Sequence, residues 1–400
     1  MPDRLRLLTF TTLYPNSVNP RHGIFVETRL RQLLDSGDIQ ARVMAPVPWF
    51  PFAQGLFGAW GRYARIPKSD TRHGIEVEYP RYPLLPRVGM NLAPLAIALR
   101  TLPLLRRQIR EGLDFDLIDA HYFYPDGVAA TLLGHWLNKP VVVTARGSDV
   151  NVLPDFPLPR KMILWTTQQA DACITVSQSL RDKLVTLGAP PEHMVVLRNG
   201  VDLTLFQPCD RNFLRHQLNL TGRILLSVGN LVRLKGNHLT IEALEQLPDT
   251  HLVIIGEGPE KPSLRELADR LGLSQRVHFL GNIPQNELPL YYSGADALIL
   301  ASSREGWANV LLEAMACGTP VVATDVGGNR EVVTRRAAGV LAPERTPAAL
   351  RHAVLDLFHA PPLRQETRQY AEQFGWHDTS AGQKNLFCQV LSARARRAAP

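Results

Sequence analysis

Two glutamates flank a short glycine-bearing loop in the second half of the 400-residue chain. Glu305 precedes Gly306, and Glu313 lies about one turn inside a helix predicted over residues 309–316. Backbone N–H groups at Gly306 and Trp307 could bind an anion at the helix N-terminus, and two carboxylates could accept hydrogen bonds from sugar hydroxyls. The alternative is that Glu305 only interacts with the helix dipole and that Glu313 is a solvated surface charge.

The segments around this loop alternate between strand and helix patterns. Residues 296–300 and 320–324 are short apolar runs typical of buried strands. Between them, the apolar residues of 309–316 share one face, and Gly318 is well placed to end the helix. The pattern predicts a doubly wound α/β sheet, in which the loops after the strands bind ligands.

A second loop of this kind follows a strand predicted over residues 223–228. It contains Gly229, Asn230, Arg233 and Lys235. A strand followed by a glycine turn and two cations can hold a diphosphate. A surface turn with two incidental cations is the alternative. Two further strands are followed by glycine-bearing turns, one containing Gly256 and the other containing Ile283.

Strand patterns with polar residues after them also recur in the first half of the chain. Gly23 closes a polar loop after the first strand, where it would let backbone approach a substrate closely. A plain surface turn is the alternative. His121 follows a strand over residues 117–120, and Arg146 and Asp149 follow the next strand. These side chains are predicted to lie at a ligand-binding edge.

Composition and charge limit the classes of protein. The length predicts two domains, and the four scattered cysteines argue against a disulfide framework or a structural zinc site. No signal peptide or transmembrane segment is visible, so a cytoplasmic protein is expected. Residues 1–200 carry 23 Lys and Arg against 17 Asp and Glu, which is +6, and residues 201–400 carry 21 against 20, which is +1. No metal, cofactor or nucleic-acid partner is predicted.

The basic excess is concentrated between residues 81 and 110, where six arginines and no acidic residue alternate with leucines. This composition is typical of a helix at a membrane interface. We therefore expect peripheral attachment to anionic lipid at the inner face of the membrane, through residues 87–110. The alternative is a core helix with solvated arginines on its outer face.

Residues 302–331 closely resemble the donor-site segment of family 4 retaining glycosyltransferases, which have the two-domain GT-B fold. The similarity lies in the spacing Glu305 to Glu313, the sequence Ala-Met-Ala-Cys-Gly-Thr-Pro-Val-Val-Ala and a later Gly-Gly-x-x-Glu. The resemblance implies that Glu305 lies near the transferred sugar and that Glu313 binds the ribose hydroxyls. It also implies that loop backbone near Ile283 meets the nucleotide base.

The chain departs from that family at two positions. The family pattern Gly-Arg-Leu-x-x-x-Lys-Gly is matched at Lys235, whereas Asn230 replaces the arginine, and Arg233 is offset by three positions. The family also has His-Gly-x-Asp where this chain has Arg146 before Gly147 and Asp149. An arginine there could contact donor phosphate or an acidic acceptor.

The resemblance implies two Rossmann-like domains that face a cleft. Residues 1–205 would bind the acceptor, residues 206–375 would bind the donor, and a helix over residues 376–391 would pack back onto the first domain. The expected reaction transfers a sugar from a nucleotide-sugar, with UDP as the expected nucleotide, to a saccharide or lipid-linked acceptor with retention, in polysaccharide or cell-envelope synthesis. An epimerase or phosphorylase of the same fold, and a non-catalytic nucleotide-sugar-binding protein, are the alternatives.

Overall fold

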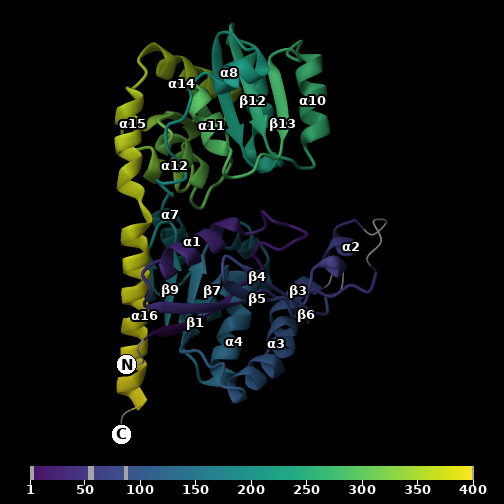
Figure 1. Cartoon of the computed structure of the whole chain (residues 1–400), viewed down its shortest axis with the longest axis vertical. Helices are drawn as coiled ribbons and strands as arrows, with labels where there is room; N and C mark the ends of the chain where they lie inside the picture. Colours follow the sequence, from purple (N-terminus) through teal and green to yellow (C-terminus); the bar gives the residue numbers. More distant parts are fainter. Residues whose placement is uncertain (1–3, 53–57, 85–88, 399–400) are drawn as a thin grey trace. The chain divides into compact units, whose positions relative to one another are not determined.

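The structure is a computed structural model that describes residues 4–52, 58–84 and 89–398. The chain forms two compact units (Figure 1). Unit 1 comprises Met1–Arg198 with His377–Pro400, and unit 2 comprises Asn199–Trp376. Each unit contains a large, mainly parallel sheet with helices around it, so the predicted α/β class is confirmed.

The main sheet of unit 1 has the strand order β10-β9-β8-β7-β1-β2-β5-β4. All neighbours are parallel except β4 and β5, and β3 pairs separately with β6. The strands are β1 (Leu5–Phe10), β2 (Ile39–Met44), β3 (Val47–Pro48), β4 (Ser69–Arg72), β5 (Ile75–Glu78), β6 (Arg81–Tyr82), β7 (Leu117–His121), β8 (Val141–Ala145), β9 (Ala172–Thr175) and β10 (Met194–Val196).

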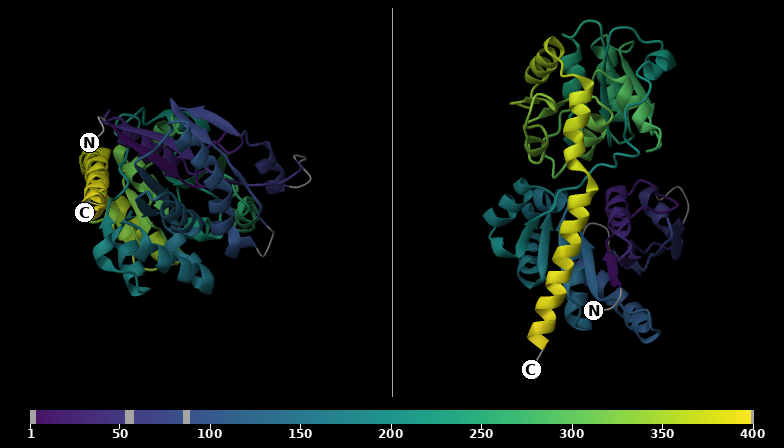
Figure 2. Two further views of the ribbon diagram at one scale, coloured as in Figure 1. Left: turned by 90° about the horizontal axis from the view of Figure 1, so that it is seen from below. Right: turned by 60° about the vertical axis from the view of Figure 1, so that its left-hand side comes forward.

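The helices of unit 1 come from both ends of the chain. They are α1 (Ile24–Leu34), α2 (Gly58–Arg65), α3 (Ala93–Arg110), α4 (Val128–Leu137), α5 (Ser148–Asn151), α6 (Pro157–Gln169), α7 (Gln178–Thr186) and α16 (Trp376–Ala398). In the core, Leu386 and Phe387 of α16 pack in one cluster with Leu7 and Leu117 of the sheet. Figure 2 shows α16, at the yellow end of the chain, running along unit 1.

The last helix is longer than expected. It was predicted over residues 376–391, and it continues to Ala398. Arg394, which lies beyond the predicted end, donates to Asn138 Oδ1 at 2.7 Å and lies 3.4 Å from Asp171 Oδ2. These contacts with the rest of unit 1 stabilise the added turns.

Unit 2 has one six-stranded, wholly parallel sheet with the order β13-β12-β11-β14-β15-β16. The strands are β11 (Arg223–Val228), β12 (Thr250–Ile255), β13 (Val277–Gly281), β14 (Ala297–Leu300), β15 (Val321–Thr324) and β16 (Gly339–Ala342). The helices are α8 (Phe213–Leu218), α9 (Asn237–Leu244), α10 (Lys261–Arg270), α11 (Leu288–Gly294), α12 (Asn309–Ala316), α13 (Asn329–Val332), α14 (Pro347–His359) and α15 (Arg364–Ala371).

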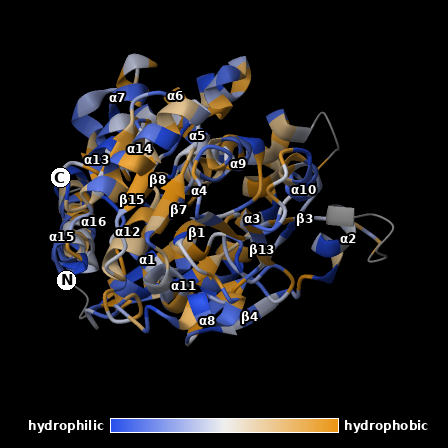
Figure 3. Ribbon diagram, turned by 90° about the horizontal axis from the view of Figure 1, so that it is seen from above, coloured by the Kyte–Doolittle hydropathy of each residue, from blue (hydrophilic) through white to orange (hydrophobic). Residues whose placement is uncertain are grey.

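Several inner strands of both sheets are buried along their whole length. Every residue of β8 and β15 is buried, and both strands are largely hydrophobic (Figure 3). Strands covered by helices on both faces are continuous apolar runs rather than alternating ones. This is why such short segments were recognisable in the sequence.

The chain order reverses once in each main sheet. In unit 2, β11 lies between β12 and β14, so successive strands are added first on one side of β11 and then on the other. In unit 1, β1 lies between β2 and β7 in the same way. Ligands of doubly wound sheets bind beside the strand carboxyl ends at such switch points. The loops after β11 and β14, and those after β1 and β7, are therefore the places to search for a site.

Candidate functional site

The loops after β11 and β14 lie against each other at the switch point of unit 2. Ser303 N–H donates to the carbonyl of Leu234 at 2.9 Å. Gly236 has φ 71°, and a Cβ there would lie 2.1 Å from the carbonyl oxygen of Ala301. Only glycine fits this close backbone contact in the left-handed region. The structure thus brings together the two loops that the sequence singled out in this unit.

Lys235 and Glu305 form an ion pair where these two loops meet. Lys235 Nζ lies 2.6 Å from Glu305 Oε1, and their side chains are 25% and 10% exposed. Ser302 Oγ donates to the same carboxylate oxygen at 2.6 Å. The pair therefore places a positive charge beside an oriented carboxylate at the carboxyl edge of the sheet. A cation in this position can offset charge on a phosphate group.

Glycines pack the neighbouring loops closely at the same edge. A Cβ on Gly256 would lie 1.9 Å from the carbonyl oxygen of Gly229, and Gly256 N–H donates to the carbonyl of Gly281 at 2.7 Å. Ile283 lies half-buried in the loop after β13. The ends of β11, β12 and β13 thus form one continuous backbone surface, which includes three of the loops predicted to bind the donor.

The loop after β15 covers the other side of the Glu305 loop. Cβ atoms on Gly327 and Gly328 would lie 2.1 and 2.3 Å from the carbonyl oxygens of Glu305 and Gly306, respectively. Trp307 is buried, and its indole N–H donates to the carbonyl of Asn199 at 3.0 Å. Its ring therefore fixes the loop within unit 2. A donor-binding role for the Trp307 backbone stays a prediction.

Glu313 lies one turn inside α12, as predicted, and contacts a residue that the sequence analysis missed. The hydroxyl of buried Tyr292 in α11 donates to Glu313 Oε2 at 2.7 Å. Burial raises the pKa of Glu313 to about 7, and the Tyr292 hydrogen bond opposes this shift. Glu313 is thus no solvated surface charge. It is a carboxylate that the Tyr292 hydroxyl orients through Oε2.

The cations around Lys235 differ from the expected set. Asn230 and Arg233 are both exposed in the loop after β11. Arg345, which follows β16, donates from Nε to the carbonyl of Ala301 at 2.9 Å and from a second nitrogen to the carbonyl of Arg233 at 3.3 Å. Burial and the nearby Arg233 charge both lower the pKa of Arg345. Arg345 is therefore an additional cation at this edge, and no sequence spacing pointed to it.

In unit 1, His121 and Arg146 contact each other at the switch point. A guanidinium nitrogen of Arg146 lies 2.6 Å from His121 Nδ1, and His121 Nε2 lies 3.3 Å from Asp119 Oδ2. Burial lowers the pKa of His121 to about 4, so the ring is neutral at pH 7. Nδ1 then accepts from Arg146, and the Nε2 proton faces Asp119. Burial, together with the Arg29 charge, holds the pKa of Arg146 well below its ordinary value.

This contact continues into the interior of unit 1. Gln383 of α16 donates to Asp119 Oδ2 at 3.1 Å and accepts from Nε of buried Arg29 at 2.8 Å. The chain of hydrogen bonds therefore runs from α1 and α16 to His121 and Arg146. None of these three partners was predicted.

The Asp149 side chain accepts hydrogen bonds from backbone N–H groups and is buried. Its carboxylate accepts hydrogen bonds from the N–H groups of Gly147 at 2.7 Å and Phe123 at 2.8 Å. Burial raises the pKa of Asp149. The aspartate ties the loop after β8 to the loop after β7, so it positions Arg146 and His121.

Gly23 begins α1, with φ 68°. A Cβ at this position would lie 2.1 Å from the carbonyl oxygen of Leu13. The glycine is therefore required by the backbone of its own loop. The group that approaches Gly23 in the structure is the carbonyl of Leu13. Contact between this loop and a substrate stays a prediction.

A buried carboxylate at this switch point was missed from the sequence. Asp126 Oδ2 accepts from Thr12 N–H at 2.8 Å and from the Thr11 and Thr12 hydroxyls at 3.3 and 3.0 Å. Burial raises the pKa of Asp126 to about 7. Asp126 thus joins the loop after β1 to the loop after β7, which are the two sides of the switch point.

Comparisons with known proteins agree with this arrangement of two sheets. Residues 58–205 match the model of the family described as Glycosyltransferase Family 4, and residues 210–374 match that of Glycosyl transferases group 1. TuaC of Bacillus subtilis, named as a glycosyltransferase with a provisional role in teichuronic acid biosynthesis, is 31% identical over 81% of this chain and 82% of its own. A D-inositol 3-phosphate glycosyltransferase of Xylanimonas cellulosilytica is 30% identical over 84% and 86%.

Solved structures resemble the chain over nearly its whole length. A sucrose-phosphate synthase of Thermosynechococcus elongatus has a TM-score of 0.78 and 20% identity, and covers 98% of this chain and 100% of its own. HepE of Anabaena, solved in complex with UDP-glucose, has a TM-score of 0.71 and 21% identity over 97% and 99%. The fold is that of the GT-B glycosyltransferases. The sequence relatives go further: the chain belongs to glycosyltransferase family 4.

Proposed function

We propose that the protein transfers a hexose from a nucleotide-sugar to a saccharide or lipid-linked acceptor of cell-envelope glycan synthesis, with retention of configuration. The observation that carries the proposal is the Lys235–Glu305 pair at the switch point of unit 2, in a chain of this family. Unit 2 would bind the donor, and unit 1 would bind the acceptor.

The chemical need is to stabilise negative charge on the leaving diphosphate. Lys235 would carry most of this role, with Arg345 or Arg233 and the Gly306 N–H as further donors, and without a metal ion. Glu313 would accept hydrogen bonds from the ribose hydroxyls through Oε1. An oxygen of the donor phosphate would take the proton from the acceptor hydroxyl.

UDP is the nucleotide that we propose. HepE, which shares the fold, was solved with UDP and with UDP-glucose. An acceptor in envelope glycan synthesis is supported by the relative named for teichuronic acid biosynthesis. Arg146 of unit 1 would contact such an acceptor, and buried His121 would hold the Arg146 side chain in place.

The test is a search for transfer products. The purified protein would be incubated with a panel of nucleotide-sugars and lipid-linked or oligosaccharide acceptors, and the products analysed by mass spectrometry. We expect an acceptor that gains one hexose, and free UDP in equal amount. NMR of the new anomeric centre would report retention. Free UDP without a modified acceptor would point to an epimerase or hydrolase, and tight UDP binding without any turnover would contradict an enzymatic role.

We further propose that unit 1 docks on anionic lipid through the outer face of α3. The inner face of this helix is core, because Ile97, Ala98 and Leu105 are buried. The outer face is apolar in its first half, where Leu95 and Leu99 are 44% and 55% exposed. The alternative of a core helix therefore describes the inner face of α3, and a membrane contact of its outer face stays a proposal.

Basic and aromatic groups surround that apolar face. Arg106, Arg107 and Arg110 are exposed in the last two turns of α3. Arg100 Nε donates to the carbonyl of Arg81 in β6 at 3.0 Å, which places the helix beside the β3–β6 pair (Figure 1). The exposed aromatic side chains Trp49 and Phe52 follow β3. Residues 85–88, which include Arg87 of the proposed segment, lie outside the described residues.

The membrane proposal predicts a charge-dependent loss of binding. Anionic lipid attracts each nearby arginine by about 1 kcal/mol, so changing Arg106 and Arg107 to Glu should weaken vesicle binding by at least about 30-fold. Sedimentation with anionic vesicles at low and high salt measures this. The neighbouring pair Arg160 and Lys161, exposed in α6, gives the matched control when changed to Glu. Equal losses in both variants, or no binding by the wild type at low salt, would reject the α3 surface.

In the described parts of the chain, the structure has no helix with both the length and the apolar content needed to cross a membrane.

A further inference from the structure

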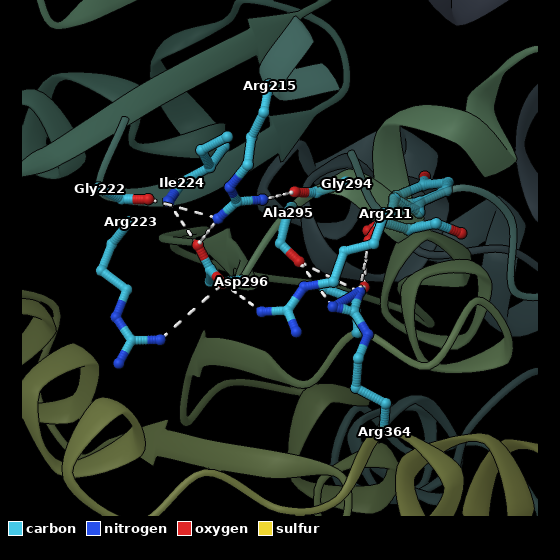
Figure 4. Close-up of polar contacts among 12 residues, drawn as sticks. Arg211, Arg215, Gly222, Arg223, Ile224, Gly294, Ala295, Asp296 and Arg364 are labelled. Atoms are coloured by element: carbon cyan, nitrogen blue, oxygen red, sulfur yellow. Dashed lines mark hydrogen bonds and ion pairs between the residues drawn. The ribbon is translucent and has the colours of Figure 1, made fainter. Parts of the chain in front are cut away.

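Three arginines contact a single carboxylate at the amino edge of the unit 2 sheet, and a fourth, Arg364, lies beside them (Figure 4). Asp296 immediately precedes β14, and its side chain is 4% exposed. Asp296 Oδ2 accepts from Ile224 N–H at 2.8 Å and from Arg215 at 2.7 Å. Asp296 Oδ1 accepts from Arg211 at 3.0 Å, and Arg223 lies 3.9 Å from it. Both carboxylate oxygens therefore accept hydrogen bonds, and Arg223 adds a longer ion pair.

The inner two arginines, Arg215 and Arg364, donate hydrogen bonds to backbone carbonyls of the same unit. Arg215 also donates to the carbonyl of Gly294 at 2.8 Å. Arg364 donates to the carbonyls of Ser293 at 2.6 Å and Ala295 at 3.1 Å. Burial lowers the pKa of Arg364 to about 10, with repulsion from Arg211 and Arg215 adding to the effect, so it remains charged at pH 7.

The charges of the cluster are not balanced. Four guanidinium groups and one carboxylate give 4 − 1 = +3. Asp210, which neighbours Arg211 in the sequence, is exposed, and its Oδ1 accepts from the N–H of Asn212 at 2.9 Å. Neutralising one buried aspartate requires one cation. The other arginines therefore raise the local positive potential without a matching acid in this set.

The outer two arginines remain accessible. The side chains of Arg211 and Arg223 are 54% and 49% exposed. Both approach the same carboxylate oxygen, and the Arg223 guanidinium lies 5.1 Å from the centre of the Phe358 ring. A guanidinium has five N–H donors, and the contacts given above use only a part of them. Two oriented guanidinium groups with donors left over match the oxygens of a phosphate group.

We infer that Arg211 and Arg223 form a binding site for a phosphate-bearing anion, with Asp296 holding both side chains in place. Arg223 is the first residue of β11, whereas Lys235 follows its last residue. At about 3.3 Å per residue, the six-residue strand separates the two edges by roughly 17 Å. The site is thus distinct from the proposed donor site and does not depend on it.

Isothermal titration calorimetry with inorganic phosphate and with diphosphate, in a buffer of low ionic strength, tests the site. Changing Arg211 and Arg223 to Gln should weaken binding by about tenfold or more, because each charge-assisted hydrogen bond contributes on this scale. Arg265 and Arg270, both exposed on α10 of the same unit, give the matched control when changed to Gln. Arg265 resembles Arg223 in facing a phenylalanine ring, at 5.5 Å from its centre.

Lys235→Ala separates this site from the donor site. Phosphate binding at the arginine cluster should persist in Lys235→Ala and weaken by about tenfold or more when Arg211 and Arg223 are changed to Gln. If binding disappears in Lys235→Ala and persists in the arginine variant, the anion binds only at the donor loop, and the inference fails. No binding to the wild type at millimolar concentration would also overturn it.

Further measurements serve as controls for the calorimetry. Changing Arg211 and Arg223 to Lys keeps the charge and loses the planar fork, so affinity should lie between those of the wild type and the Gln variant. Thermal unfolding without phosphate shows whether the variants fold. Sedimentation with vesicles that contain phosphatidic acid distinguishes a lipid headgroup from a soluble phosphate as the source. Because the α3 surface is also proposed to bind anionic lipid, the readout is the part of the sedimentation that is lost when Arg211 and Arg223 are changed to Gln. Equal phosphate affinity in all variants would leave the arginines with a structural role only.

Discussion

Replacing Lys235 by alanine should lower the turnover number by about 10²–10³, the scale of removing one electrostatic stabiliser from an active site. The Lys235 ammonium lies 2.6 Å from Glu305 and is partly exposed, so it can also contact a ligand. The variant should fold, because Ser302 still donates to Glu305 and the lysine lies in a loop. Initial rates with the identified donor and acceptor, together with a thermal unfolding curve, measure both expectations.

Lys139 provides the matched control for this variant. Its ammonium lies 2.8 Å from Asp114 Oδ1 and its side chain is 19% exposed, but it precedes β8 at the amino edge of its sheet. Lys139→Ala removes the same charge and breaks a comparable ion pair. It should leave turnover within about twofold of the wild type, because catalysis is expected at carboxyl edges. An equally small effect of Lys235→Ala would remove Lys235 from the mechanism.

Glu313→Gln should weaken UDP binding by about 10–100-fold at pH 8, because a charge-assisted hydrogen bond contributes about 1.5–3 kcal/mol. In the wild type, burial raises the pKa of Glu313 to about 7. The carboxylate form, which accepts from the ribose, therefore decreases as the pH falls from 8 to 6, and UDP affinity should fall with it. The variant has no group to titrate at this position, so its affinity should lack this component.

Calorimetry of UDP binding between pH 6 and pH 8 separates the titration of Glu313 from the ionisation of the nucleotide. Ionisation of the nucleotide's own phosphate affects binding to both proteins, so the difference between the wild type and Glu313→Gln isolates the contribution of Glu313.

The stability of the wild type depends on pH in the opposite direction to its UDP affinity. The folded protein holds a proton on Glu313 above the ordinary pKa of 4.5, so the wild type loses stability as the pH rises from about 4.5 to about 7. Glu313→Gln should therefore be more stable at pH 8, by up to about 3 kcal/mol. A variant that binds UDP as tightly as the wild type would exclude Glu313 as the ribose ligand.

Local patterns in the sequence predicted the parts of the fold that depend on short spacing. The strand at residues 223–228 and the helix at residues 309–316 were predicted with the bounds that the structure gives them. Buried parallel strands are apolar runs, and a helix with a glycine beyond its end has a recognisable period. Because loops follow strand ends in a fixed way, Lys235 and Glu305 could be expected at the same edge.

The partners of the site residues could not be predicted in this way. Tyr292 and Glu313 are separated by 21 positions, and Asp119 and Gln383 by 264. No spacing rule relates such residues, since their contact depends on how helices pack on the sheet. The same applies to Arg345, which reaches the switch point from a strand added later in the chain.

Glycines show a related limit. The sequence predicted that Gly23 allows a close approach, and the structure shows that the approaching group is the carbonyl of Leu13. Both a substrate and the backbone of the same chain require a residue without a Cβ. The sequence alone cannot tell a glycine that contacts a substrate from one that contacts its own backbone, because both positions lack room for a Cβ.

The contribution of α16 to unit 1 has a consequence for how the chain is made. Unit 2 is one uninterrupted stretch of 178 residues (199–376), whereas unit 1 needs residues 377–398 to complete its core, with Leu386 and Phe387 buried in it. At about 5–20 residues per second, a ribosome needs on the order of 10–35 s to pass from the end of the first stretch of unit 1 to its last helix. During this time unit 2 can finish folding, while the apolar residues of unit 1 that pack against α16 stay exposed to solvent and to chaperones. The unit that begins first is thus the one that is completed last.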